Sequence, residues 1–387
     1  MSGRLLRLAC TAAVATGALL VPTPAVAVPE PGPGTGTAVG KPGQRSVAGL
    51  LTDLQRLYRD AERATEAYNS TTENLKKQRA EVARLDAGLA KARRSLHDSR
   101  GAAGRLARQQ YQNSGEISSY VRLLLARDPQ HALDEGHLIG QLSQERAETV
   151  ERVAGSEKEA DTLARAARKS LDDQLTLAAR QKKDRDDVRK RLEDVEKLLS
   201  SLTVDQLSEM DRFEKSGAAK AQQKFMASGA LSSVRRPSRE GAKALRYAVR
   251  QIGKPYEWGA EGPKSYDCSG LTSQAWDHAG QPIPRTSQEQ WARLPRIPLS
   301  ELRPGDLVIY FPEATHVALY LGDGMVVQAP RPGTKIKVSP VAANPLLGAV
   351  RPDLSREPLR HYTPPKLPKR ATRGSDGGYS AAKGRGA

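Results

Sequence analysis

Apolar residues recur at alternating spacings of four and three over a long stretch near the start of the chain. The series is Leu50, Leu54, Leu57, Ala61, Ala64, Tyr68, Thr71, Leu75, Gln78, Val82, Leu85, Leu89, Ala92 and Leu96. This is the a/d repeat of a coiled coil, and charged residues fill most of the outer positions. A helix with such a stripe needs a partner stripe, so the pattern predicts a long helix packed against another.

A second stripe with the same spacing lies further along the chain, at Val188, Leu192, Val195, Leu199 and Leu202. Between the stripes, an apolar segment is interrupted by Gly115, Asp128-Pro129 and Gly136. The simplest architecture for residues 46–206 is a long antiparallel hairpin with a few short helices at its tip. Parallel dimerisation of two chains is the alternative. The apolar tip is either packed core or a partner-binding surface.

The next segments differ in composition. Residues 207–240 lose the apolar repeat in favour of Gly, Ser, Lys and Arg, which predicts a linker. Residues 354–387 are rich in Pro, Lys, Arg and Gly, which predicts a disordered basic tail. The interval 241–353 contains all three tryptophans of a chain with only 4% aromatic residues, so we expect a compact core there.

Within 241–353 the pattern alternates between helix and strand signals. We predict helices from Ala244 to Ile252 and from Cys268 to about Ala279. Strands are predicted at 307–311, 316–321 and 325–329, the last two joined by a Gly-Asp-Gly turn. The fold class is therefore α+β, with a helical hairpin followed by a domain of helices on a small antiparallel sheet.

The first 27 residues resemble an export signal. Arg4 and Arg7 precede an apolar stretch, and Ala25-Val26-Ala27 is a small-residue cleavage site. We expect a flexible leader over 28–45 and a secreted protein, extracellular or at the cell wall. The net charge of +17 then favours retention by wall polyanions over nucleic acid, for which no binding module is present.

Cleavage of this signal would leave Cys268 as the only cysteine, so it cannot form an internal disulfide. It opens a predicted helix, where unpaired backbone N–H groups favour the thiolate, and we expect a lowered thiol pKa. His316, at the start of a strand, is the candidate base, and the hairpin brings Gln328 close enough to orient its ring. The remaining histidines lie in the coiled coil, in the tail or on the cysteine's own helix: His97, His131, His137, His361 and His278.

At these residues the domain resembles the NlpC family of cell-wall cysteine peptidases, which have a papain-like fold. The resemblance covers nearly all of 241–352 and rests on Pro255-Tyr256-Glu257-Trp258-Gly259, Asp267-Cys268-Ser269-Gly270-Leu271, Pro284-Arg285-Thr286-Ser287, Pro304-Gly305-Asp306-Leu307, His316-Val317-Ala318-Leu319-Tyr320-Leu321-Gly322 and Gln328-Ala329-Pro330. The third catalytic position is commonly His, Asn or Glu in this family, so Gln328 is a departure.

The resemblance implies roles for the matched positions. Cys268 is the nucleophile, His316 the base, and Tyr256 helps to hold the oxyanion. Four matched residues line the substrate groove: Asp267, Ser269, Arg285 and Ser287. The implied substrate is peptidoglycan, cleaved between γ-D-glutamate and meso-diaminopimelate without a cofactor, in wall remodelling or cell separation. The helical half resembles coiled-coil regions of exported wall hydrolases that a division-linked membrane complex releases from inhibition.

Two other functions are compatible with the same residues. A Cys-His site of this kind also serves amidases and acyltransferases, since a thioester can be resolved by different nucleophiles. Alternatively, the coiled coil carries a regulatory function and the hydrolase is vestigial, which the intact Cys268, His316 and Tyr256 disfavour. Metal catalysis is disfavoured because no His-Glu-x-x-His or paired-cysteine spacing occurs.

Overall fold

A computed structural model describes residues 46–113, 121, 128–231, 235–369 and 371–372. The predicted signal peptide and leader, most of the hairpin tip and the end of the tail lie outside these residues. In the described part of the chain, no helix is both long and apolar enough to cross a membrane.

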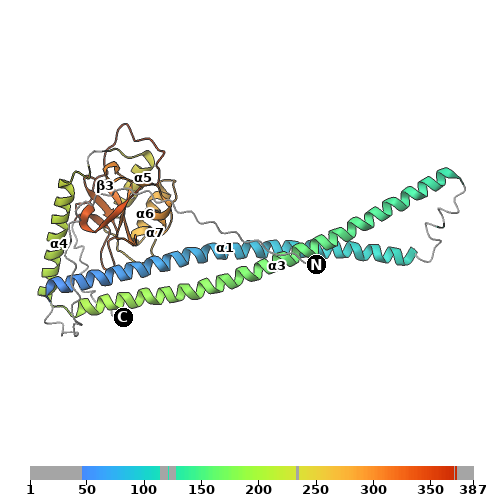
Figure 1. The fold of residues 1–387 in the computed structure, drawn as a ribbon, viewed down its shortest axis with the longest axis horizontal. Coiled ribbons are helices and arrows are strands. Elements are labelled where there is room, and N and C mark those ends of the chain that lie inside the picture. Colours follow the sequence, from blue (N-terminus) through green and yellow to red (C-terminus); the bar gives the residue numbers. More distant parts are fainter. Residues whose placement is uncertain (1–45, 114–120, 122–127, 232–234, 370, 373–387) are drawn as a thin grey trace, which may run out of the picture. The chain divides into compact units, whose positions relative to one another are not determined.

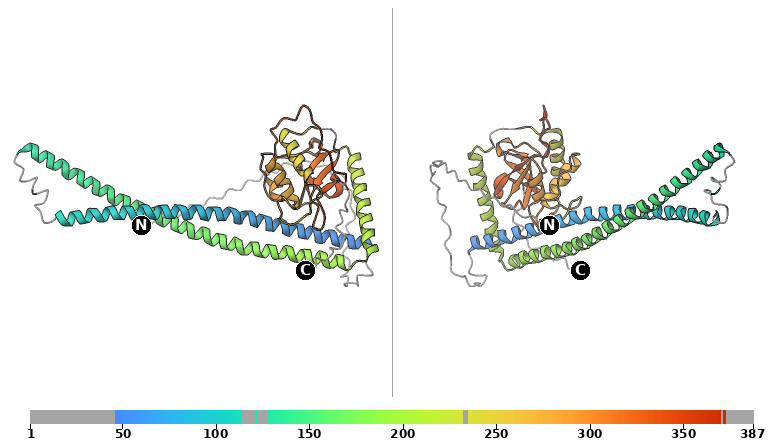
Figure 2. Two further views of the ribbon diagram at one scale, coloured as in Figure 1. Left: turned by 180° about the vertical axis from the view of Figure 1, so that it is seen from behind. Right: turned by 45° about the vertical axis from the view of Figure 1, so that its right-hand side comes forward.

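The two predicted stripes lie on long helices, α1 (Val47–Asn113) and α3 (Pro129–Ser200), which pack side by side (Figure 1, Figure 2). The helices are antiparallel, because successive α1 positions contact progressively earlier α3 positions: Thr71 bonds Asp184, Gln78 bonds Ser170 and Ser99 bonds Ser156. The seam is buried at Leu50, Leu54 and Leu75. The predicted hairpin is confirmed.

The start of α3 corrects one detail of the predicted tip. Asp128 caps the helix by accepting a hydrogen bond from the His131 N–H, and Pro129 occupies its first turn. The helix then continues through Gly136, so the prediction of a break there is wrong. A single glycine costs a helix only about 1 kcal/mol relative to alanine, which a helix of 72 residues tolerates.

A further helix, α4 (Val204–Ala227), begins just before the segment predicted as a linker and occupies more than half of it. A capping box begins it: Thr203 Oγ1 accepts from the Gln206 N–H, and the Thr203 N–H donates to the Gln206 side chain. Met210, fully buried, packs with Leu50 and Leu54 of α1. Residues 204–227 are therefore helical and anchored to the hairpin.

The C-terminal domain is a six-stranded antiparallel sheet with helices α5 (Arg239–Arg250), α6 (Cys268–His278) and α7 (Ser287–Arg293). The strands are β1 (Arg296–Ile297), β2 (Leu307–Tyr310), β3 (His316–Gly322), β4 (Met325–Gln328), β5 (Lys337–Pro340) and β6 (Leu346–Val350), in the order β1-β6-β2-β3-β4-β5. Short 3₁₀ helices span Leu299–Glu301 and Val341–Ala343. The predicted helices on a small antiparallel sheet are confirmed.

Strand β3 is central and carries the main core. Its Leu319 faces Leu307 of β2 and Val327 of β4, and it packs against α5 and α6. Trp276 of α6 is completely buried in the same core. This packing fixes the start of β3 and the start of α6 relative to each other.

Contacts of the domain extend beyond the interval 241–353. Ser238 caps α5 and bonds the buried Asp353 carboxylate. The Leu359 N–H donates to the Pro237 carbonyl, and the Val338 N–H donates to the Ala371 carbonyl. Part of the segment predicted as a disordered tail is thus bonded to the domain.

Candidate active site

Cys268 is the first residue of α6, as the sequence predicts. Asp267 caps this helix, its carboxylate accepting a hydrogen bond of 2.6 Å from the Gly270 N–H. Gly270 allows the close packing, because a Cβ there would lie 2.2 Å from the Ala260 carbonyl oxygen. The sulfur is held at the helix start, and its residue is 2% exposed.

His316 is the first residue of β3 and Gln328 the last of β4. His316 Nε2 lies 2.7 Å from Gln328 Oε1, and both side chains are buried. An amide oxygen can only accept, so the ring proton lies on Nε2 and Nδ1 keeps its lone pair. Nδ1 has no hydrogen-bond partner among the described residues. This is the tautomer that a base requires, while the catalytic role of Gln328 remains a prediction.

Burial shifts the pKa of the His316 imidazole and of the Cys268 thiol so that each neutral form is favoured. The pKa of His316 falls from 6.5 to about 4, mainly because the ring is desolvated. Burial, followed by the charges of Glu66, Asp267 and Glu62, raises the pKa of the Cys268 thiol well above its ordinary value. The predicted lowering of the thiol pKa is therefore wrong for this structure, because burial and three carboxylates outweigh the helix start.

Tyr256 is also buried, at the loop that leads from α5 to α6. Its hydroxyl pKa is raised well above 10, first by burial and then by the charge of Cys268. The hydroxyl is therefore protonated and lies within electrostatic range of the sulfur. A protonated hydroxyl can donate a hydrogen bond, as the role predicted for Tyr256 requires.

The four predicted groove residues form one buried network. Arg285 donates to both carboxylate oxygens of Asp267, at 3.1 and 2.7 Å, and to Ser269 Oγ at 2.9 Å. Asp267 and Arg285 are 0% and 8% exposed. Ser287 begins α7 and points its backbone N–H toward the same place. The structure brings all four together around the start of α6.

Helix α1 covers this site, which the sequence did not predict. The Glu66 carboxylate accepts from Ser269 Oγ at 2.7 Å and from the Ser287 N–H at 2.9 Å, and lies 3.8 Å from Cys268 Sγ. One turn earlier, Glu62 Oε1 lies 3.6 Å from His316 Nδ1.

One turn after Glu66, Asn69 Nδ2 donates to Asp267 Oδ2 at 3.1 Å. Glu62, Glu66 and Asn69 occupy outer heptad positions, where charged and polar residues ordinarily face water. One available signal was the low charge of this stretch, in which Glu66 is the only charged residue between Ala64 and Thr72.

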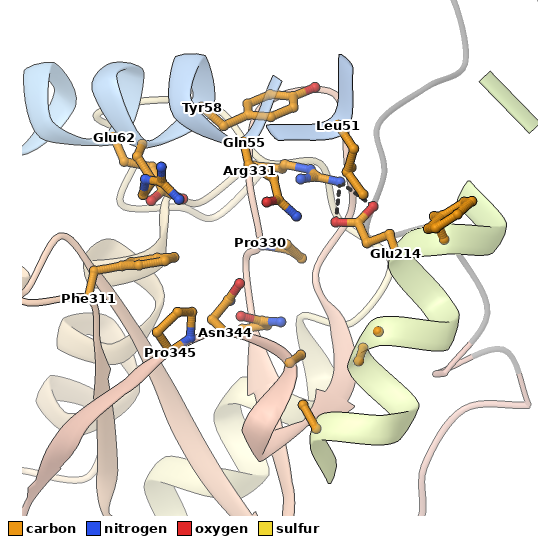
Figure 3. Close-up of a pocket in the computed structure, with 17 residues that line it drawn as sticks. Leu51, Gln55, Tyr58, Glu62, Glu214, Phe311, Pro330, Arg331, Asn344 and Pro345 are labelled. Carbon is orange, nitrogen blue, oxygen red and sulfur yellow. Dashed lines mark hydrogen bonds and ion pairs between the residues drawn. The ribbon is translucent and has the colours of Figure 1, made fainter. Parts of the chain in front are cut away.

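A cavity of about 260 Å³ lies beside the covered site, between α1, α4 and the domain (Figure 3). Glu62 and Gln328 line one part of it. At the α4 side, Arg331 donates to both carboxylate oxygens of Glu214 at 3.0 Å and lies over the Tyr58 ring. Within the described residues, no group of three or more His, Cys, Asp or Glu could hold a metal ion.

The arrangement defines a class of protein. A cysteine at a helix start, a histidine at the start of a strand packed against that helix, and an amide hydrogen-bonded to the histidine are typical of papain-like cysteine hydrolases. Residues 253–348 match the NlpC/P60 family, so the C-terminal part of the chain contains an NlpC/P60 domain.

Several known proteins are similar to part of this chain. "Probable endopeptidase Cgl2188" of Corynebacterium glutamicum is 42% identical over 116 residues, which are 30% of this chain and 56% of that protein. "Probable endopeptidase Rv2190c" of Mycobacterium tuberculosis is 35% identical over 108 residues, 28% of each chain. The crystal structure of the NlpC/p60 domain of the peptidoglycan hydrolase SagA is 33% identical, with 29% of this chain and 97% of that chain covered and a TM-score of 0.27. The chain thus spans about half or less of the length of these two curated relatives.

Proposed function

We propose that this chain is a secreted peptidoglycan hydrolase that cuts the stem peptide between γ-D-glutamate and meso-diaminopimelate, in wall remodelling or cell separation. The observation that carries the proposal is the 2.7 Å hydrogen bond from His316 to Gln328, which leaves Nδ1 as a base at the start of β3. The names of the matched relatives support the endopeptidase class.

In the first half of the reaction, His316 Nδ1 accepts the thiol proton and Cys268 Sγ attacks the scissile carbonyl carbon. The carbonyl oxygen becomes an oxyanion, which the Tyr256 hydroxyl and a backbone N–H at the start of α6 stabilise. The intermediate collapses with cleavage of the C–N bond. The departing amine takes the proton from His316, and a thioester to Cys268 remains.

In the second half, His316 Nδ1 accepts a proton from water and the resulting hydroxide attacks the thioester carbonyl. The C–S bond breaks, the sulfur regains the proton, and a new glutamyl carboxyl group leaves. Gln328 acts on both halves as a positioning residue, because its acceptor keeps the imidazole in the tautomer with a basic Nδ1.

The test is digestion of purified peptidoglycan with a fragment of residues 235–372, which retains the Ser238 cap and the contacts of Asp353 and Ala371. Mass spectrometry of the products should show a new γ-D-glutamyl carboxyl and a free amine on diaminopimelate. A freed muramyl lactyl group would instead identify an amidase. The same fragment with Cys268→Ala is the control, and cleavage by that variant would contradict the proposal.

A further inference from the structure

A second cavity, of about 280 Å³, lies on the C-terminal domain where the segment before α5 meets the segment after β6. Its described lining residues are Arg235, Arg236, Arg303, Arg351, Pro358 and Leu359. None of these is acidic. The two segments are joined beside the cavity, because the Leu359 N–H donates to the Pro237 carbonyl. The cavity therefore combines concentrated positive charge with a small apolar wall.

Two of the lining arginines are held in place by buried carboxylates. Arg303 pairs with Asp353 at 2.9 Å, and Arg351 donates to both oxygens of Asp306 at 2.9 and 2.8 Å. All four residues are at most 7% exposed. Within the described residues, Nε of Arg303 and Nη1 of Arg351 donate to no acceptor. Two rigidly held guanidinium groups thus keep N–H donors for an anion.

Arg236 adds a charge that no carboxylate neutralises. Its side chain is exposed and donates to the Arg360 carbonyl, and it forms no ion pair in the part of the chain that the structure describes. Asp353 and Asp306 balance the charges of Arg303 and Arg351, so an anion in the cavity would be attracted chiefly by Arg236 and bonded by all three.

The positive charge continues along α5, which begins three residues after Arg236. The basic residues of this helix recur at spacings of four, three and four: Arg239, Lys243, Arg246 and Arg250. They share the face opposite the buried Ala244, Leu245 and Ala248, and none of them pairs with a carboxylate within the described residues. From Arg239 to Arg250 the helix rises roughly 16 Å, which is enough for more than one anionic group.

The chemistry of this surface favours a polymer of phosphodiesters. The planar guanidinium group of arginine matches the oxygens of a phosphate in pairs. Pro358 and Leu359 form a wall for a carbon chain, which inorganic phosphate lacks. A row of cations along α5 suits repeated negative charges better than a single small anion.

The same surface is poorly suited to a membrane or to nucleic acid bases. The exposed side of α5 carries one aromatic residue, Tyr247, whose ring contacts Arg250 and His278. It therefore offers no apolar face for insertion into a bilayer and no row of aromatic rings for stacking bases.

We propose that the arginine cavity and the basic face of α5 bind a polyol phosphate polymer of the cell wall, with one phosphodiester in the cavity and others along the helix. The choice of polymer rests on the proposed function, which places the protein at the wall. None of these residues belongs to the candidate active site. Binding therefore retains the domain at the wall without occupying the groove around Cys268.

Two triple variants of the whole chain test the proposal, both made in a Cys268→Ala parent so that the wall is not digested. The test triple is Arg236→Gln, Arg239→Gln and Arg246→Gln. The control triple is Arg79→Gln, Arg93→Gln and Arg94→Gln, which removes three exposed arginines of α1 that form no ion pair within the described residues. Both triples lower the net charge by the same amount.

The measurement is the Kd for poly(glycerol phosphate) at about 0.15 M salt, with circular dichroism as a check on folding. The test triple should bind roughly tenfold more weakly than the parent, because three ion pairs with phosphate are lost. Its affinity should also depend less on salt concentration. The control triple should bind like the parent. Cosedimentation of the parent with isolated walls should decrease when hydrofluoric acid has removed their phosphodiester-linked polymers.

Equal losses in the two triples would show that binding follows net charge and would overturn the site, as would undiminished binding by the test triple. Tighter binding of duplex DNA or of phosphatidylglycerol vesicles, if abolished in the test triple, would overturn the wall polymer as the ligand. Polymer binding by a chain that cleaves no peptidoglycan contradicts the endopeptidase alone. Cleavage without polymer binding contradicts the polymer site alone.

Discussion

Gln328 is the residue whose contribution the structure defines most sharply. Its side chain is 2% exposed and its Oε1 accepts the only hydrogen bond shown for the His316 ring within the described residues. Gln328→Ala leaves the buried Nε2–H without a partner. Such a loss costs about 1–3 kcal/mol, which corresponds to a roughly 5- to 150-fold lower kcat if it falls on the transition state.

The conservative variant separates orientation from packing. Gln328→Glu keeps an acceptor at the same place and adds a negative charge, which raises the pKa of His316. Catalysis needs a neutral Nδ1, so the acid limb of the pH–rate profile follows that pKa. We therefore expect the acid limb of Gln328→Glu to lie at higher pH than that of the wild type.

The assay is muropeptide release by the fragment 235–372 over a range of pH, with thermal unfolding measured in parallel. Gln281→Ala is a control that removes a partly buried amide with only a 3.5 Å contact to the Pro352 carbonyl, and its kcat should equal that of the wild type. A wild-type kcat for Gln328→Ala, or an unmoved acid limb for Gln328→Glu, would refute the orienting role.

Three further outcomes follow from the site. Cys268→Ala should abolish hydrolysis while circular dichroism and the unfolding midpoint change little, and residual cleavage would exclude the thioester route. Burial raises the pKa of Glu62 to about 8 and of Glu66 to about 7 in the covered site. In the covered site both glutamates keep their protons to higher pH than they would with their ordinary pKa of 4.5. The packing of α1 over the site is therefore most stable below pH 4.5 and weakens as the pH rises through about 8. Hydrogen exchange at the starts of α6 and α7, corrected for its intrinsic pH dependence, should then increase over this interval, and constant protection would contradict the prediction. Arg285→Ala should lower the free energy of unfolding of the domain by about 3–5 kcal/mol in urea, because it strands a buried carboxylate. Arg293→Ala, at an exposed position, should lower the free energy of unfolding by less than about 0.5 kcal/mol. An equal loss in the two variants would contradict the buried role of Arg285.

The sequence predicted those parts of the fold that local pattern determines. The heptad repeat predicted α1 and its partner, since an apolar stripe has to be buried somewhere. The turn at Gly322-Asp323-Gly324 predicted the pairing that places His316 and Gln328 at hydrogen-bond distance. The helix predicted from Cys268 does begin there, and the structure shows Asp267 as its cap.

Contacts between segments far apart in the sequence could not be predicted from local patterns. Glu66 and Ser269 are separated by 203 positions, and a glutamate at an outer heptad position has the appearance of a solvated charge. Helix α4 was missed because few of its apolar residues are buried; Gln222 instead bonds the Gly324 carbonyl and the Ala342 N–H. A helix held by polar contacts of this kind shows no periodic pattern of apolar residues in its sequence.

The error in the thiol pKa has the same origin and bears on mechanism. A helix start favours the thiolate of Cys268 only where competing charges are absent and water can reach the sulfur. In the covered site burial is the largest contribution to the raised pKa, and two of the three carboxylates that add to it, Glu62 and Glu66, come from α1. Removal of α1 withdraws both carboxylates and readmits water, while Asp267 remains paired with Arg285. In this structure one helix therefore both covers the candidate site and adds two of the charges that raise the thiol pKa of Cys268.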